Sequence, residues 1–232
     1  MSRILVATIA LTACIPDPPA RPSFQVDVLP ILAANCVRCH GSPALGGAPS
    51  EFRLDAFDDA VIRDGTMNDS CGDDAADPTI AFVLCGARTR AALTALRIRD
   101  TAYPMPPRFP LDDYQTEVLE RWANDPIRGE PRAGNREPTI EVLDVVDAGA
   151  RATISVAVDD VDHDVVSGIL YARLDTPGAA RVIVGPVGGG HTRLDWDTTG
   201  LVRGTYRLVA SLDDGAEAIE VSMGTITLAE VP

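Results

Sequence analysis

The chain has 232 residues, a length that fits one or two domains of ordinary size, and we expect two. Because 46% of its residues are hydrophobic, it can bury a core and is not a disordered acidic tail. Its formal net charge is −14, and all 20 positive charges are arginines. Phosphates require a basic surface, so this charge excludes nucleic acid as a partner and excludes direct docking on an anionic membrane surface.

Residues 1–14 predict an export signal. The apolar run from Ile4 to Ala13 is too short to span a bilayer and has the length of a signal-peptide core. The run ends in LTAC, which resembles the lipobox of bacterial lipoproteins. This resemblance implies cleavage before Cys14, acylation of its sulfur and a lipid anchor on a bacterial membrane facing the periplasm or the cell surface. Ile15 after the cysteine favours the outer membrane. Ordinary cleavage that leaves Cys14 unmodified is the alternative.

Export would place the remaining cysteines in an oxidising compartment, where cysteines form disulfides or are attached covalently to another group. Residues 15–22 contain four prolines and predict a semi-rigid tether between the anchor and the first folded segment.

The first folded segment begins with a predicted helix. Apolar residues recur there at helical spacing, namely Phe24, Val28, Ile31 and Leu32. Ser23 is the expected N-cap of this helix, and Pro30 should kink or restart it.

The sequence CVRCH at residues 36–40 carries the most specific chemistry. Two thiols three residues apart can each add across a haem vinyl group, and the adjoining His40 can bind the iron axially. A redox CxxC pair usually precedes a helix in a βαβ setting, which this segment lacks. A zinc site would need a second close pair of ligands, which Cys71, Cys85, His163 and His191 do not offer. We therefore expect one covalent haem c on Cys36 and Cys39.

The iron of a c-type haem usually takes a second axial ligand, and Met67 and Met105 are the candidates in this half of the chain. Met105 stands in YPMPP, where prolines on both sides restrict the backbone and hold the sulfur in place. We expect Met105 to be the distal ligand. Met67, or no sixth ligand, is the alternative.

Residues 23–128 resemble a small monohaem cytochrome c domain of the histidine/methionine type, because a helix leading into CxxCHG, a Met-Pro-Pro loop and a terminal helix follow one another. The resemblance implies an all-α haem domain in which the terminal helix crosses the first. That helix is predicted over residues 111–122, with Asp112 or Asp113 as its cap. Aromatic residues make up only 5% of the chain, and a porphyrin would supply the missing apolar filling.

Carried over by position, Cys36 and Cys39 form the thioethers, His40 is the proximal ligand and Met105 the distal one. Three arginines lie near Met105 in the sequence, namely Arg97, Arg99 and Arg108. One of them could pair with a haem propionate, and the alternative is that they are exposed on the surface.

Residues 57–100 depart from a minimal cytochrome. We expect a disulfide between Cys71 and Cys85, which would close a loop of about 15 residues and stabilise the fold by about 3 kcal/mol. Four acidic residues lie within this stretch, and we expect a solvated loop rather than a cation site. These are Asp69, Asp73, Asp74 and Asp77.

A polar stretch rich in proline and glycine, residues 129–138, predicts a linker. Residues 139–232 then show short alternating runs separated by Asp/Gly turns, which is typical of an all-β sandwich. The runs cover residues 140–145, 152–158, 169–174, 182–184, 206–212 and 226–228. Residues 194–215 resemble bacterial immunoglobulin-like or fibronectin-like modules, with Trp196 in the core and Tyr206 where a tyrosine corner would lie.

Two further features of the second segment contain residue types that can bind metals. A turn holds the four carboxylates of Asp159, Asp160, Asp162 and Asp164, as calcium loops can, but the tight-position glycine and the closing glutamate are missing. A solvated turn is therefore preferred to calcium. His163 and His191 are expected to be surface residues.

The sequence thus predicts a multidomain protein, an all-α cytochrome c-like haem domain followed by an all-β immunoglobulin-like sandwich. Its expected role is single-electron transfer as a carrier rather than as an enzyme, with a redox partner that has a basic docking face. The alternatives are a haem subunit of a larger oxidoreductase complex, peroxidase-like activity at an open iron, and a surface or scaffold lipoprotein whose sandwich binds a partner. With a single CxxCH, a dihaem peroxidase is excluded within this chain.

Overall fold

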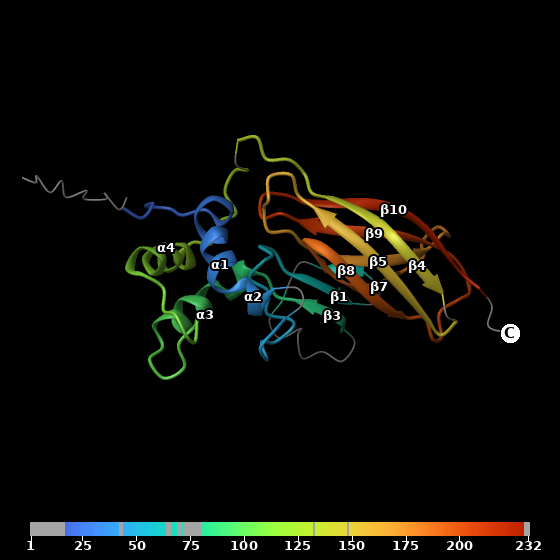
Figure 1. Cartoon of the computed structure of the whole chain (residues 1–232), viewed down its shortest axis with the longest axis horizontal. Helices are drawn as coiled ribbons and strands as arrows, with labels where there is room; N and C mark the ends of the chain where they lie inside the picture. The colour runs from blue at the N-terminus through green and yellow to red at the C-terminus, as the bar shows by residue number, and fades with distance from the viewer. Residues whose placement is uncertain are drawn as a thin grey trace, which may run out of the picture.

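The computed structural model describes residues 17–41, 44–63, 66–68, 71, 80–131, 133–147 and 149–229. Within them a small helical part comes first, and antiparallel sheets packed as a sandwich-like β region follow. Figure 1 shows the helices grouped at one end of the molecule and the long strands at the other. Cys14 and the export segment lie outside the described residues. Among the described residues, no helix is long and apolar enough to cross a membrane.

The first predicted helix forms in three consecutive pieces, a π-helix η1 (Phe24–Val28), α1 (Leu29–Asn35) and α2 (Val37–His40). Pro30 stands in the first turn of α1, where its missing N–H costs no hydrogen bond, so the helix restarts there as expected. Ser23 precedes η1 but makes no capping hydrogen bond with its side chain. Instead, its backbone N–H and its hydroxyl donate to Asp27 Oδ2 at 2.8 and 3.1 Å, so the Ser23 side chain is a donor here and not the acceptor that a cap requires.

The terminal helix α4 (Asp113–Asn124) confirms the prediction closely. Asp112 caps it, and Gln115 completes a capping box, because Asp112 Oδ1 accepts from the Gln115 N–H at 2.7 Å. The apolar face of α4 is buried, and the Trp122 ring lies 5.8 Å from the Phe24 ring of η1. The first and last helices are thus packed together around a shared core.

The segment between them is not purely helical, which corrects the all-α expectation. It contains a three-stranded antiparallel sheet in the order β2-β1-β3, formed by β1 (Ala60–Arg63), β2 (Thr66–Asn68) and β3 (Ile80–Leu84). A further helix that was not predicted, α3 (Ala87–Arg99), follows the sheet. The expected disulfide between Cys71 and Cys85 is confirmed, and it ties residue 71 to the end of β3.

The β region consists of two antiparallel sheets. One has the order β10-β9-β6-β7, and the other has the order β4-β5-β8. The strands are β4 (Thr139–Asp147), β5 (Arg151–Asp159), β6 (Ser167–Leu174), β7 (Arg181–Gly188), β8 (Gly190–Asp197), β9 (Gly204–Asp213) and β10 (Ala218–Leu228). Six of them cover the predicted runs. The seventh, β8, was not predicted as a strand.

Alternation places the apolar side chains of both sheets in one core. In β5 every second residue from Ala152 to Val158 is buried, and in β9 every second residue from Tyr206 to Leu212 is buried. Trp196 belongs to this core and meets Tyr206 edge to face, with ring centroids 5.6 Å apart. The Tyr206 hydroxyl donates to the Val202 carbonyl oxygen at 2.8 Å, the hydrogen bond expected of a tyrosine corner.

The two parts are in contact. After α4 the chain folds back on η1, because the Phe24 N–H donates to the carbonyl oxygens of Ile127 and Arg128, both at 3.0 Å. The Arg128 guanidinium then binds Asp58 of the helical part and both carboxylate oxygens of Asp213 at the end of β9. The helical part is therefore held against the sandwich by a partly buried set of ion pairs.

Candidate functional site

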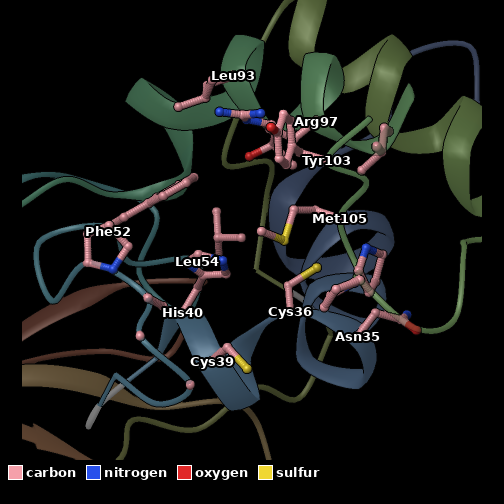
Figure 2. Close-up of a pocket in the computed structure, with 18 residues that line it drawn as sticks. Asn35, Cys36, Cys39, His40, Phe52, Leu54, Leu93, Arg97, Tyr103 and Met105 are labelled. Atoms are coloured by element: carbon pink, nitrogen blue, oxygen red, sulfur yellow. The ribbon is translucent and has the colours of Figure 1, made fainter. Parts of the chain in front are cut away.

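A cavity of about 660 Å³ opens in the helical part. One wall comes from the α1–α2 turn, and the facing wall comes from α3 and the loop that follows it (Figure 2). Four residues predicted from the sequence, separated by up to 69 positions, all line this cavity. They are Cys36, Cys39, His40 and Met105. Its size is that of a pocket for a small molecule or cofactor.

A tight turn of backbone presents the two thiols and the imidazole together. Cys36 stands between α1 and α2, and its carbonyl oxygen accepts from the N–H groups of Cys39 at 3.0 Å and of His40 at 2.9 Å. Both cysteines are free thiols. Burial, followed by the nearby Cys39, raises the pKa of the Cys36 thiol to about 11, so Cys36 stays protonated at neutral pH.

Gly41 allows the turn to close. A Cβ atom at this position would lie 2.5 Å from the Val37 carbonyl oxygen and 2.9 Å from Val37 Cγ1, so any other residue would force the turn apart. The next segment of chain supports the same turn, since the Leu54 N–H donates to the His40 carbonyl oxygen at 2.8 Å. On either side of Leu54, Arg53 and Asp55 form a buried ion pair, with Arg53 Nε 2.8 Å from Asp55 Oδ1.

His40 has the properties of a metal ligand. Burial lowers the pKa of its imidazole below the ordinary value, and a hydrogen bond with the Phe52 backbone offsets this only in part. The ring therefore favours the neutral form, in which a nitrogen lone pair can bind a metal. It lies 4.8 Å from the Phe52 ring, and its Nδ1 is buried without a hydrogen-bond partner among the described residues.

Met105 enters from the opposite wall, on the loop after α3. Two hydrogen bonds start this loop, because Asp100 Oδ1 accepts from the N–H groups of Ala102 and Tyr103 at 2.8 and 3.0 Å. The Met105 N–H then donates to the Arg97 carbonyl oxygen at 3.1 Å, which fixes its backbone to the end of α3. Figure 2 shows the Met105 sulfur pointing into the space above Cys36 and His40.

The other candidate residues from the sequence differ in their position relative to the cavity. Arg97 lines the cavity, whereas Arg99 forms two hydrogen bonds with Glu120 outside it and Arg108 is exposed. Met67 stands in β2 opposite Ile62, and its side chain is not described. The acidic cluster also lies outside the described residues, namely Asp69, Asp73, Asp74 and Asp77.

The carboxylate turn of the sandwich is organised by its own backbone. Asp160 Oδ1 accepts from the N–H groups of Asp162 and Asp164, at 2.8 and 3.2 Å. In the part of the chain that the structure describes, no group of three or more His, Cys, Asp and Glu residues could hold a metal ion. His163 and His191 are both exposed, as expected.

The wall of the cavity opposite the CVRCH motif was not predicted from the sequence. Residues of α3 line the cavity at positions spaced by one helical turn, namely Leu93, Thr94, Arg97 and Ile98. The signal available was the run of strong helix formers in ARTRAALTALRIR. It predicts a helix but not which of its faces meets the cavity.

No protein-family model matches the chain, and a search of curated proteins finds no match either. The chemistry of the site must therefore be judged from its own residues.

These residues fit a covalently attached haem. The cavity is bordered by two free thiols and a neutral imidazole whose buried Nδ1 lacks a partner, and a thioether sulfur faces them. The volume of the cavity lies in the range of cofactor pockets, and His40 and Met105 are the residues that would bind the iron.

Proposed function

We propose that this chain is a c-type cytochrome that carries single electrons through one covalently bound haem c. The observation that carries the proposal is that Cys36, Cys39 and His40 share one cavity with Met105, a residue far along the chain. In this assignment the two cysteines hold the haem, His40 is the proximal ligand and Met105 the distal ligand. In this role the protein would carry electrons rather than catalyse a reaction of its own.

Attachment uses the thiols in the state that the site favours. Cys36 and Cys39 would hold the haem through two thioether bonds, since each S–H would add across one vinyl group. This addition consumes no oxidant and releases no leaving group. It requires reduced, unpaired cysteines, as Cys36 and Cys39 are here.

The haem would supply an iron that cycles between ferrous and ferric states. His40 contributes a neutral nitrogen held by the α2 turn, and Met105 contributes a soft sulfur that favours the reduced state and raises the potential. Because Met105 would itself be a ligand of the iron, it would oppose binding of oxygen or peroxide.

We further propose that residues 23–128 form a cytochrome c-like haem domain, residues 129–138 the linker and residues 139–232 an immunoglobulin-like sandwich. The packing of α4 on η1 through Trp122 and Phe24 supports the first assignment. The tyrosine-corner hydrogen bond from Tyr206 to Val202 supports the last.

The same proposal includes export and lipidation at Cys14, with the protein held on a bacterial membrane facing the periplasm. The disulfide between Cys71 and Cys85 suits an oxidising compartment. The net charge of −14 favours a redox partner with a basic face. The arginines of α3 beside the cavity do not oppose this, because three of them are neutralised by acidic neighbours. These pairs are Arg88–Asp58, Arg97–Asp100 and Arg99–Glu120.

Mass spectrometry of the denatured full-length chain tests the proposal. We expect haem to remain bound to the peptide that contains Cys36 and Cys39, and to be lost from the Cys36→Ser/Cys39→Ser variant. The absorption spectrum of the haem provides a second measurement. His40→Ala should abolish the low-spin absorption spectrum, whereas replacing the exposed His191 by alanine should leave it unchanged. A natural chain that carries no covalent haem would falsify the assignment.

A further inference from the structure

The wall of the cavity formed by α3 has a polar residue without a protein partner. Thr94 lines the cavity and is only 7% exposed, and its Oγ1 makes no hydrogen bond with any described residue. A threonine in a helix can satisfy its hydroxyl with the backbone one turn earlier, but Thr94 does not. A buried hydroxyl is rarely left unpaired, so a partner for Thr94 is expected inside the cavity.

Arg97 follows Thr94 by three positions, which places both side chains on the same face of α3. Its Nη1 binds Asp100 Oδ2 at 3.1 Å, and its other guanidinium nitrogens make no hydrogen bond within the described residues. The side chain is 45% exposed, so Arg97 stands at the edge of the cavity rather than in its depth. Figure 2 shows it on the wall facing the cysteines.

One turn before Thr94, Arg90 adds to the same pattern. Its guanidinium lies 5.5 Å from the centre of the Phe52 ring, which lines the cavity, and its Nε is buried without a partner. This side of α3 thus has several hydrogen-bond donors for which the described residues provide no acceptor.

We propose that Thr94 and Arg97 bind a carboxylate of the group held in the cavity, which is a propionate of the haem. This inference rests on the proposed function. An ionised carboxylate only accepts hydrogen bonds, so it matches the hydroxyl of Thr94 and the free edge of the Arg97 guanidinium. Thr94 binds from the interior and Arg97 from the rim, so the carboxylate lies where the cavity meets solvent.

Substitution of these side chains leaves the distal loop in place. Met105 is bound to α3 through the backbone carbonyl oxygen of Arg97, which every variant retains. Effects of Arg97→Gln and Thr94→Val on the bound cofactor can therefore be separated from loss of the distal ligand.

The propionate bending modes in the resonance Raman spectrum of the holoprotein test the inference. We expect these modes to shift in Thr94→Val and in Arg97→Gln, because each variant removes a hydrogen bond to the carboxylate. The matched controls are Thr116→Val, an equally buried threonine of α4, and Arg99→Gln, an arginine bound to Glu120 outside the cavity. Both controls should show the modes of the unmodified protein. Unchanged modes in both test variants would overturn the inference.

A binding experiment covers the case in which either variant fails to mature. The full-length Cys36→Ser/Cys39→Ser chain is titrated with haemin and with haemin dimethyl ester, whose carboxylates are blocked. We expect the ester to bind about tenfold more weakly, as loss of one charge-assisted hydrogen bond predicts. Adding Thr94→Val or Arg97→Gln should reduce this difference. Equal affinity for the two compounds overturns the inference.

The two proposals fail in different ways. A natural chain that contains covalent haem but gives unchanged propionate modes and equal ester binding overturns the carboxylate site alone. A natural chain without covalent haem overturns the proposed function and the carboxylate site with it.

Discussion

Met105 reaches the cavity from a loop that is fixed at its start by Asp100 and along α3 by the Arg97 carbonyl oxygen. The side chain is 42% exposed, so little packing holds it in place. Its position is therefore set by backbone hydrogen bonds and flanking prolines rather than by burial, which leaves the sulfur free to bind a metal.

Replacing this sulfur should change the spectrum and the potential without changing the fold. In Met105→Leu, which conserves volume, we expect loss of the far-red absorption of an iron–methionine bond and a lower midpoint potential. Absorption spectroscopy and potentiometric titration measure both effects. Met223→Leu, a change at a half-buried methionine in the sandwich, should leave them unchanged. A high-spin ferric spectrum in the unmodified protein would contradict the assignment of Met105.

The Cys36 thiol provides a second residue-scale prediction in the haem-free chain. Because burial raises its pKa to about 11, its thiolate fraction at pH 8 is about 100-fold below that of a thiol at the ordinary value of 9.0. A more basic thiolate is more nucleophilic, which recovers about tenfold. We expect Cys36 to react with iodoacetamide about tenfold more slowly in the native chain than in urea. Equal rates, measured by peptide mass spectrometry, would contradict this prediction.

At the level of residues, the sequence predicts the site where chemistry dictates a spacing. The two thiols and the imidazole of CVRCH stand within five residues, and all three line one cavity. Arg97, Arg99 and Arg108 could not be told apart, since only the direction of α3 decides that Arg97 faces the cavity and that Arg99 meets Glu120. Thr94 gave no signal, because its role comes entirely from the cavity it lines.

The helix α4 shows what a local signal can fix at the scale of an element. Asp112 and Gln115 satisfy two N–H groups at its start, and apolar residues at helical spacing bury one face. Both features are present in the sequence. By contrast, Ser23 has the position and residue type of a cap, yet its hydroxyl donates to Asp27 Oδ2 and accepts no hydrogen bond from the first turn of η1.

The capping box makes a measurable contribution to stability. Asp112→Ala removes an acceptor for the Gln115 N–H, and we expect the free energy of unfolding to fall by about 1 kcal/mol. Urea denaturation followed by circular dichroism measures the change. Asp113→Ala is the control, because Asp113 lies in the first turn without capping the helix, and its loss should cost less. An equal effect of the two substitutions would count against the capping role.

The elements that were missed lacked such signals. The strands β1–β3 are three to five residues long, and their pairing is settled by contacts with one another rather than by alternation along one strand. The helix α3 has strong helix formers, but the leucines Leu93 and Leu96 are exposed, and the residues it buries are small or polar, namely Ala87, Ala91 and Thr94. A helix of this kind shows little hydrophobic periodicity, so its sequence does not show which face is buried.

At the scale of the whole molecule, the contact between the two parts could not be predicted at all. The sequence of residues 129–138 has the composition of a linker, but in the structure one of its own side chains, Asn135, contacts both parts. Asn135 Nδ2 donates to Asp214, and its Oδ1 accepts from Gln25 of η1. Gly215, at φ +88°, lies against Leu29, where a Cβ atom would approach Leu29 Cδ2 to 2.6 Å. Each of these contacts depends on the folded form of both partners.

Arg128 is the central side chain of this contact. Its guanidinium is 18% exposed, forms two hydrogen bonds with Asp213 and one with Asp58, and lies 4.8 Å from the centre of the Phe57 ring. Asp213 is itself 12% exposed in its side chain, so it depends on Arg128 for neutralisation. Buried charges are costly when one partner is removed. We therefore expect the pair to couple the unfolding of the two parts, although their hydrophobic cores are separate.

The chain provides a direct test of this coupling, because each part holds one of its two tryptophans, Trp122 and Trp196. In the Trp196→Phe and Trp122→Phe backgrounds, fluorescence reports the unfolding of one part at a time. Each tryptophan substitution changes the stability of the whole protein, and circular dichroism measures that change. After this correction, we expect the fluorescence of the two variants to give the same urea midpoint. Arg128→Ala should then lower stability by about 3 kcal/mol and separate the midpoints. Arg207→Ala breaks a half-exposed pair with Asp175 within the sandwich and should cost less than about 1 kcal/mol without separating them. Coincident midpoints in Arg128→Ala would show that the two parts are coupled by their apolar contacts and not by this arginine.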